Sequence, residues 1–146
     1  MGYNTKFSGS LTLSRKLTLA EAKEFLDANE DPDSIEPAPG IRSYMQWVPS
    51  ESLDAIVYDG NEKFYDYDKW LQWVLDRLAK MGIVADGSIV WSGESAGDVG
   101  VLKVQSNSLT VKKGDMPVNP SAKPLTLGKL GEIALNRLTT IDSLES

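Results

Sequence analysis

Strict alternation of residue types over residues 3–13 is the feature that most constrains how this chain folds. Apolar or small residues fall on one side of the alternation (Tyr3, Thr5, Phe7, Gly9, Leu11 and Leu13), and polar residues fall on the other (Asn4, Lys6, Ser8, Ser10 and Thr12). A period of two places these sets on opposite faces of a strand. The sequence therefore predicts that the chain begins with a half-buried β-strand.

Two segments further along the chain carry helical periodicity instead. Thr18 and Glu21 have the spacing of a capping box, and an apolar stripe continues from Leu19 to about Asn29. A longer helix is expected from about Asp66 to Lys80. Its wide apolar face consists of Trp70, Leu71, Val74, Leu75 and Leu78. Gly82 follows as a natural C-terminal stop.

Short β-rich runs supply the remaining strands, at residues 43–48, 54–58, 88–92, 100–105 and 108–113. Ser106 and Asn107 join the last two as a tight hairpin turn. The resulting order is β-α-β-β-α-β-β-β, which predicts an α+β fold with an antiparallel sheet and two helices on one face. The first six elements match the split βαβ, or ferredoxin-like, pattern.

The end of the chain differs in character from the domain predicted over residues 1–113. Residues 114–125 have the composition of a linker, and residues 126–146 are expected to form a short amphipathic helix and a tail. Gly128 and Gly131 each weaken that helix by roughly 1 kcal/mol relative to alanine. A helix this weak needs a docking surface. Its own sheet, another subunit and a foreign partner all remain open.

The absence of certain residue types limits the chemistry available to this protein. The 146 residues include no histidine and no cysteine. This excludes a Ser-His-Asp triad, a thiol nucleophile and a conventional zinc site, so a bound metal would have to be a hard cation held by oxygen atoms. We expect no cofactor.

Charge and hydropathy narrow the expected partners and location. The net charge of −6 disfavours direct binding to nucleic acid, whose phosphates are also negative. No apolar run reaches the roughly 18 residues that a membrane helix needs, and the start lacks the apolar core of a signal peptide. A cytoplasmic protein without membrane contacts is therefore expected.

Acidic turns and the tail provide the candidate binding residues. The first group lies in or near the turn before the long helix and consists of Asp59, Glu62, Asp66 and Trp73. The second lies in the loop after strand 88–92 and consists of Glu94 and Asp98, and the third is the apolar tail stripe of Leu127, Leu130 and Ile133. Most acidic and aromatic residues around the first group are expected to have structural roles: they form the turn, cap the helix (Asp66 or Asp68) or pack in the core. A few carboxylates remain available for contact.

Three stretches resemble a family of small bacterial and bacteriophage proteins. They read QWVPSE (46–51), YDGNEKFYDYDKWLQWVL (58–75) and GSIVWSGESAGDVGVLKV (87–104). The matching positions include Asp59, Gly60, Glu62, Lys63, Tyr65, Trp91, Gly93, Glu94, Asp98 and Gly100. Tyr58 departs from the tryptophan usual in that family, and residues 114–146 have no counterpart there. The resemblance implies a bacterial or phage origin and an intracellular accessory role, and it brings no activity or cofactor.

Two classes of function fit these observations. The first is a non-enzymatic acidic interaction protein, an accessory of the host-takeover or anti-defence type, which binds a protein partner or self-associates through its tail helix. The second is a carboxylate site for a metal or small molecule, formed by Asp59, Glu62, Glu94 and Asp98, with hydrolysis as its chemistry. A virion structural component is a further alternative. The missing histidine and cysteine favour the first.

Overall fold

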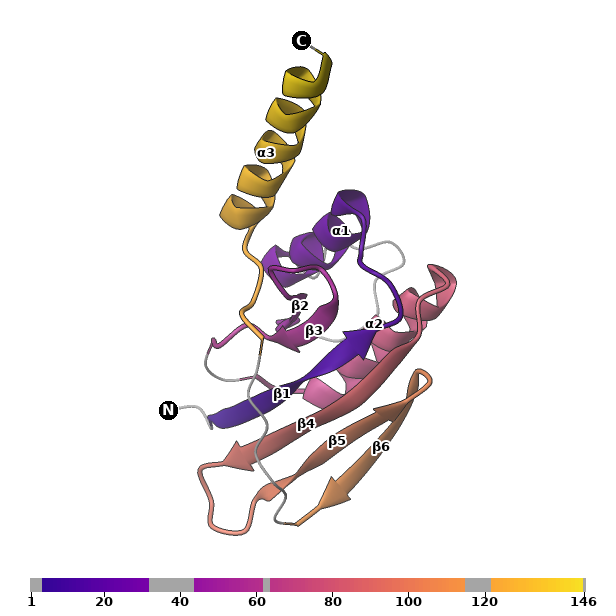
Figure 1. Cartoon of the computed structure of the whole chain (residues 1–146). Helices are drawn as coiled ribbons and strands as arrows, with labels where there is room; N and C mark the ends of the chain where they lie inside the picture. Colours follow the sequence, from indigo (N-terminus) through magenta and orange to yellow (C-terminus); the bar gives the residue numbers. More distant parts are fainter. Residues whose placement is uncertain (1–3, 32–43, 62–63, 115–121, 146) are drawn as a thin grey trace.

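The protein has an α+β fold in which the described residues form one six-stranded antiparallel sheet and three helices (Figure 1). The computed structural model describes residues 4–31, 44–61, 64–114 and 122–145. The elements are β1 (Thr5–Leu13), α1 (Leu19–Glu30), β2 (Trp47–Pro49), β3 (Ala55–Tyr58), α2 (Tyr67–Lys80), β4 (Ala85–Gly93), β5 (Val99–Gln105), β6 (Ser108–Lys113) and α3 (Leu127–Glu145).

The strands lie in the order β2-β3-β1-β4-β5-β6, and each neighbouring pair is antiparallel. β1 and β4 pair along their full lengths, from Thr5 opposite Gly93 to Leu13 opposite Ala85. Two strand boundaries differ from the sequence prediction by three residues or more. β2 begins only at Trp47, because residues 44–46 are not in a strand, and β4 begins at Ala85 rather than at residue 88.

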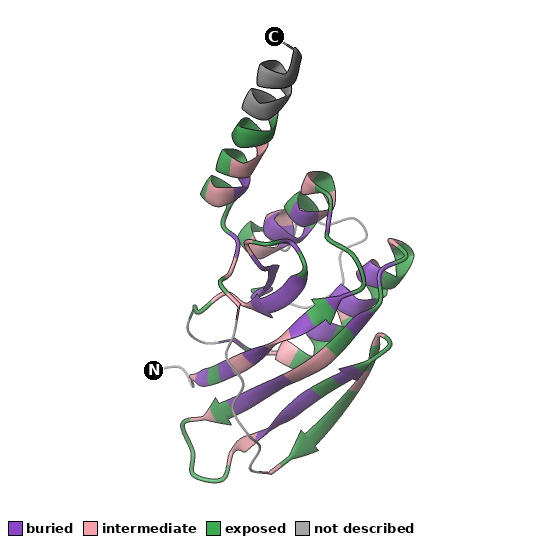
Figure 2. Cartoon of the chain, in the orientation of Figure 1, coloured by how far each residue is buried: buried purple, intermediate pink, exposed green. Residues whose placement is uncertain are grey.

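The core lies on the face of the sheet that carries the odd-numbered residues of β1. Phe7 and Trp91 are opposite one another there, and Gly100 is next in the same row on β5. A methyl group at Gly100 would lie 2.2 Å from the Trp91 ring and 2.4 Å from the Lys112 carbonyl oxygen. Glycine at this position therefore lets the indole pack directly against the backbone of β5. Figure 2 shows burial over the central strands, whereas β6 is largely exposed.

Local signals at the ends of elements account for several boundaries. The Glu21 N–H donates to the Thr18 hydroxyl at 3.1 Å, and Thr18 N–H donates to the Glu21 carboxylate at 2.9 Å, which confirms the capping box. α2 ends at Lys80, and Gly82 follows two residues later with a φ of 75°, which is accessible to glycine. Ser106 and Asn107 both have positive φ and confirm the tight turn between β5 and β6.

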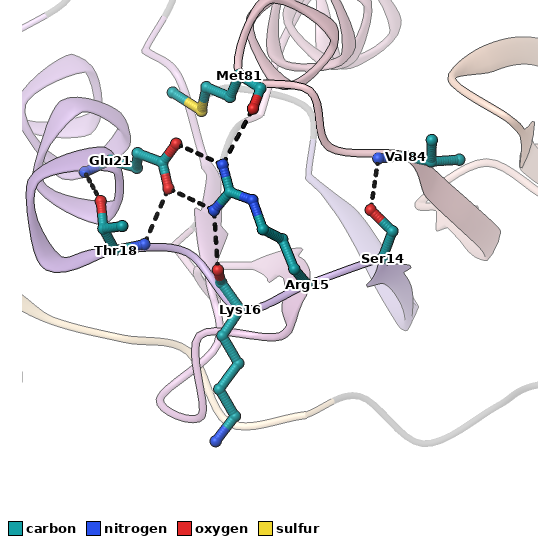
Figure 3. A network of polar contacts seen from close by, with 7 residues as sticks. All are labelled: Ser14, Arg15, Lys16, Thr18, Glu21, Met81 and Val84. Atoms are coloured by element: carbon teal, nitrogen blue, oxygen red, sulfur yellow. Dashed lines mark hydrogen bonds and ion pairs between the residues drawn. The ribbon is translucent and has the colours of Figure 1, made fainter.

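A network around Arg15 joins three elements at one end of the core (Figure 3). The Arg15 guanidinium donates to both carboxylate oxygens of Glu21, at 2.8 and 2.9 Å, and to the Met81 carbonyl at 3.0 Å. Beside it, Ser14 and Val84 exchange hydrogen bonds between β1 and the start of β4. The beginning of α1 is thereby tied to the end of α2.

The residues before α3 are bonded to the interior strand β1 and to the edge strand β2. Ala122 N–H donates to the Ser10 hydroxyl at 3.0 Å, and Leu125 N–H donates to the Pro49 carbonyl at 2.8 Å. Pro124 forms an antiparallel bridge with Ser50 beside β2. The end of the predicted linker thus adds to the edge strand β2.

α3 is a continuous helix of 19 residues, so the expectation of a short helix is wrong. The Thr126 hydroxyl accepts from the Lys129 N–H at 3.1 Å and caps its start. Gly128 and Gly131 lie within it without interrupting it. No helix in the described part of the chain combines the length and the apolar character needed to cross a membrane.

Candidate functional site

The tail helix is anchored at its beginning and leaves the body of the protein along its length (Figure 1). Leu125 and Leu130 are buried in the common core, and Ile133 packs partly against it. α3 contacts α1. In contrast, Leu127 is 41% exposed and Leu135 is 65% exposed. The three predicted contact residues of the tail therefore divide into an anchor, Leu130 with Ile133, and an open position, Leu127.

Asp59 lies at the centre of a cluster of amide side chains after β3. Its Oδ1 accepts from the Asn61 N–H at 2.8 Å, and its Oδ2 accepts from the side-chain amides of Asn29 and Asn61 at 2.9 and 3.0 Å. Gln46 lies beside them, and its amide nitrogen, in the orientation that satisfies both ends of the group, donates to Oδ1 at 3.2 Å. The Asn29 amide also donates to the Met45 carbonyl at 2.8 Å. The cluster ties the end of α1 to the segments flanking β2 and β3.

Burial raises the pKa of Asp59, and the hydrogen bonds from Asn61 and Asn29 partly oppose that shift. No ion pair involves this carboxylate within the described residues. Each of its oxygens already accepts two N–H groups, which fills the roughly four acceptor positions of a carboxylate. Asp59 is therefore placed to supply negative charge rather than a free oxygen ligand.

A pocket of about 300 Å³ opens over this cluster. Its lining comprises Asn29, Glu30, Tyr44, Gln46, Asp59 and Asn61. Tyr44 is 68% exposed, and Glu30 is exposed as well. A wider hollow of about 520 Å³ lies on β5 and β6, is lined by Lys103, Lys112 and uncharged polar side chains, and contains no carboxylate.

The two other predicted acidic residues after β4 have separate partners. The Glu94 carboxylate accepts from the Asn4 N–H at 2.9 Å, and the Asp98 carboxylate accepts from the Trp91 indole N–H at 3.1 Å. Glu62 lies outside the described residues. Among those that are described, no three carboxylates come together as a metal would require.

Asp66 lies directly before α2, and Trp73 lies within that helix. Asp66 is the N-cap residue in a left-handed conformation, but its side chain makes no capping hydrogen bond, so the expected carboxylate cap is wrong for this residue. Trp73 is half-buried and meets Phe25 of α1 edge to face, with ring centroids 6.2 Å apart. The Arg77 guanidinium lies over the same indole at 5.3 Å.

Sequence reasoning selected Asp59 but missed the residues around it. Asn29 ends the apolar stripe of α1, and Gln46 is a polar residue between Met45 and Trp47 that is only 4% exposed. A glutamine that is buried needs hydrogen-bond partners for its amide. The position of Gln46 between two large apolar residues was therefore the one sequence signal of the cluster. Comparison of the chain with protein-family models, with curated proteins and with solved structures finds no match.

Proposed function

We propose that this protein is a non-enzymatic interaction protein that binds a protein partner through the open face of α3. The observation that carries this proposal is the contrast along one helix, where Leu130 is 8% exposed and Leu135 is 65% exposed. A leucine that exposed on a helix leaving the body offers apolar area to a partner. The burial of Leu125 and Leu130 ties the beginning of α3 to the body of the protein.

Residues 46–51, 58–75 and 87–104 resemble small bacterial and phage proteins, and this resemblance supports the bacterial cell as the place of the interaction. We infer an accessory role inside the bacterial cell, of the host-takeover or anti-defence type. The net charge of −6 suits contact with a basic protein better than contact with nucleic acid.

A ferredoxin-like unit is the finer description of the fold that we propose. The strand order β2-β3-β1-β4 with antiparallel pairing supports it, because these are the four strands that such a unit needs. The contact between Phe25 and Trp73, and the ion pair of Glu24 with Arg77 at 3.1 Å, support helices α1 and α2 packed side by side. β5 and β6 would then be additions to the unit.

The interaction proposal is tested by replacing the exposed leucine and measuring capture from bacterial lysate. We expect Leu135→Glu to reduce the amount of captured partner at least about fivefold, because a charge in an apolar contact costs well over 1 kcal/mol. Val111→Glu is the matched control, since Val111 is 49% exposed but lies on β6. Equal capture by wild type and Leu135→Glu would contradict the proposal.

Light scattering on the same proteins separates a foreign partner from a second copy. A dimer in the wild type that becomes a monomer in Leu135→Glu identifies the partner as another copy of this chain. A monomer in both, combined with loss of capture, identifies a different protein.

A further inference from the structure

The pocket over Asp59 has a hydrogen-bonding character that indicates its ligand. The amide nitrogens of Asn29, Asn61 and Gln46 all donate inward, to Asp59 or to backbone carbonyls. The amide oxygens of Asn29 and Asn61, by contrast, accept no hydrogen bond from any described residue. What these side chains leave for a ligand is therefore mainly acceptor oxygens, with one N–H of the Asn61 amide as the remaining donor.

The charge of the pocket favours a ligand that is a cation as well as a hydrogen-bond donor. Asp59 is the partly buried carboxylate beneath the amides, and Glu30 lines the same pocket from the end of α1. Within the described chain neither forms an ion pair. A partly buried negative charge without a cation is costly, and the raised pKa of Asp59 reflects that cost. A bound cation would compensate for it.

Tyr44 distinguishes between kinds of cation. Tyr44 is 68% exposed and lines the same pocket as Glu30. Guanidinium is planar, carries five N–H donors and no acceptor, and stacks on aromatic rings. An ammonium ion is a more strongly hydrated point charge, and a hard metal ion needs six or more oxygen ligands. Asp59 has no free oxygen to give such a metal.

We propose that this pocket binds a guanidinium group, which Glu30 pairs with, Tyr44 stacks on, and the charge of Asp59 and the oxygens of Asn29 and Asn61 attract. The group can belong to a free arginine-like molecule or to an arginine side chain of a peptide. This site goes beyond the function proposed for α3. The pocket and the exposed face of α3 share no residue, so either proposal can fail while the other stands.

The test is an NMR titration of the full chain with N-acetyl-arginine-methylamide. The matched ligands are the citrulline analogue, which has the same shape without the charge, and the lysine analogue. We expect saturable shifts of the Asn29 and Asn61 side-chain amide signals with arginine, at least about threefold weaker binding of lysine, and no saturation with citrulline. Equal binding of arginine and citrulline, or saturation by CaCl₂ or MgCl₂ but not by arginine, would overturn the proposal.

Variants at the exposed edge of the pocket test the assigned residues without threatening the fold. Asp59→Asn puts an NH₂ donor where the partly buried cluster needs an acceptor oxygen and can unfold the protein, so Glu30→Gln and Tyr44→Ala are used instead. Each is expected to weaken arginine binding about threefold. Glu132→Gln on α3 removes the same charge away from the pocket and is expected to bind like wild type. Wild-type affinity in both Glu30→Gln and Tyr44→Ala would contradict the assignment.

Titration with a short peptide that has arginine in its middle distinguishes the two sources of the guanidinium group, a peptide and a small molecule. Tighter binding of this peptide than of the single blocked amino acid indicates a protein or peptide ligand. Equal affinities indicate a small molecule. Both results support guanidinium recognition, whereas binding of neither overturns it.

Discussion

Helices α1 and α3 are both capped by a threonine, but they are held against the body of the protein in very different ways. The Thr18 hydroxyl of α1 and the Thr126 hydroxyl of α3 each accept a backbone N–H three residues later, both at 3.1 Å. In α1 that third residue is Glu21, whose carboxylate accepts the Thr18 N–H in turn. In α3 it is Lys129, which cannot accept one and also brings positive charge to a helix N-terminus.

Burial separates the two helices further. α1 buries Ala22, Phe25, Leu26 and Ala28 along its length. In α3, of the side chains that the structure describes, only Leu130 is buried, and those from Leu135 to Arg137 are exposed. The comparison teaches that a threonine cap sets where a helix starts, whereas tertiary burial determines how firmly it is held. α1 is part of the body, and α3 is a docked extension of it.

The largest expected effect is the loss of an anchor in α1. Phe25 is fully buried and packs edge to face on Trp73. Phe25→Ala is expected to lower the free energy of unfolding by about 4 kcal/mol, because it leaves a cavity between α1 and α2. Urea unfolding followed by tryptophan fluorescence measures this change. A loss below about 1 kcal/mol would mean that α1 is not integral to the core.

The corresponding change in α3 is expected to be smaller and local. Leu130→Ala removes the main buried side chain of the helix, at a cost of about 2 kcal/mol to docking. Amide exchange over residues 127–137 should accelerate, while the urea midpoint of the body stays nearly unchanged. Leu135→Ala is the control and should change neither by more than about 0.5 kcal/mol. Cooperative loss of the whole fold in Leu130→Ala would contradict the idea of a docked extension.

Those parts of the fold that depend on neighbours in sequence could be predicted from the sequence. The capping box of Thr18 and Glu21, the apolar face of α2 and the turn at Ser106 and Asn107 are local patterns, and the structure has all three. The length of α3 could not be predicted. Two glycines made it seem weak, and the burial of Leu130 that offsets them depends on a surface more than a hundred residues earlier in the chain.

The same limit applies to the candidate site. Asp59 was identified because it lies in an acidic turn, but Asn29, Tyr44 and Gln46 come to it from other parts of the chain. Such amides are ordinary surface residues in sequence terms, and only the folded chain brings them around one carboxylate. The packing of Trp73 could not be predicted either, because its contact with Phe25 depends on how α1 and α2 meet.

The reciprocal cap of α1 should be visible in the pH dependence of stability. The hydrogen bonds and charge of Arg15 lower the pKa of Glu21 from 4.5 to about 2. A lowered carboxylate pKa adds stability above pH 4.5, and that stability is lost as the pH falls toward 2. Because the Arg15 side chain is 43% exposed, solvent screening reduces the effect, and Glu21→Gln should cost about 1 kcal/mol at pH 7.

Urea unfolding at pH 7 and pH 2.5 checks this prediction. The difference between wild type and Glu21→Gln should shrink at the lower pH, where Glu21 is partly protonated in the wild type. Asp27→Asn is the matched control on the same helix, because Asp27 pairs with Lys23 at 2.8 Å on an exposed face. Its cost should be about 0.3 kcal/mol. A difference for Glu21→Gln that does not change with pH would contradict the role given to its charge.

The smallest effect comes from giving α3 the cap that α1 has. In the described part of the chain the Thr126 N–H donates no hydrogen bond, and glutamine at position 129 could accept it as Glu21 does in α1. Lys129→Gln also removes a positive charge from the helix start and loses only an exposed ion pair with Glu132. We expect α3 to gain about 0.5 kcal/mol, seen as roughly twofold slower amide exchange over residues 127–137. Lys112→Gln on β6 should leave that exchange unchanged, and faster exchange in Lys129→Gln would show that the threonine cap of α3 cannot be completed.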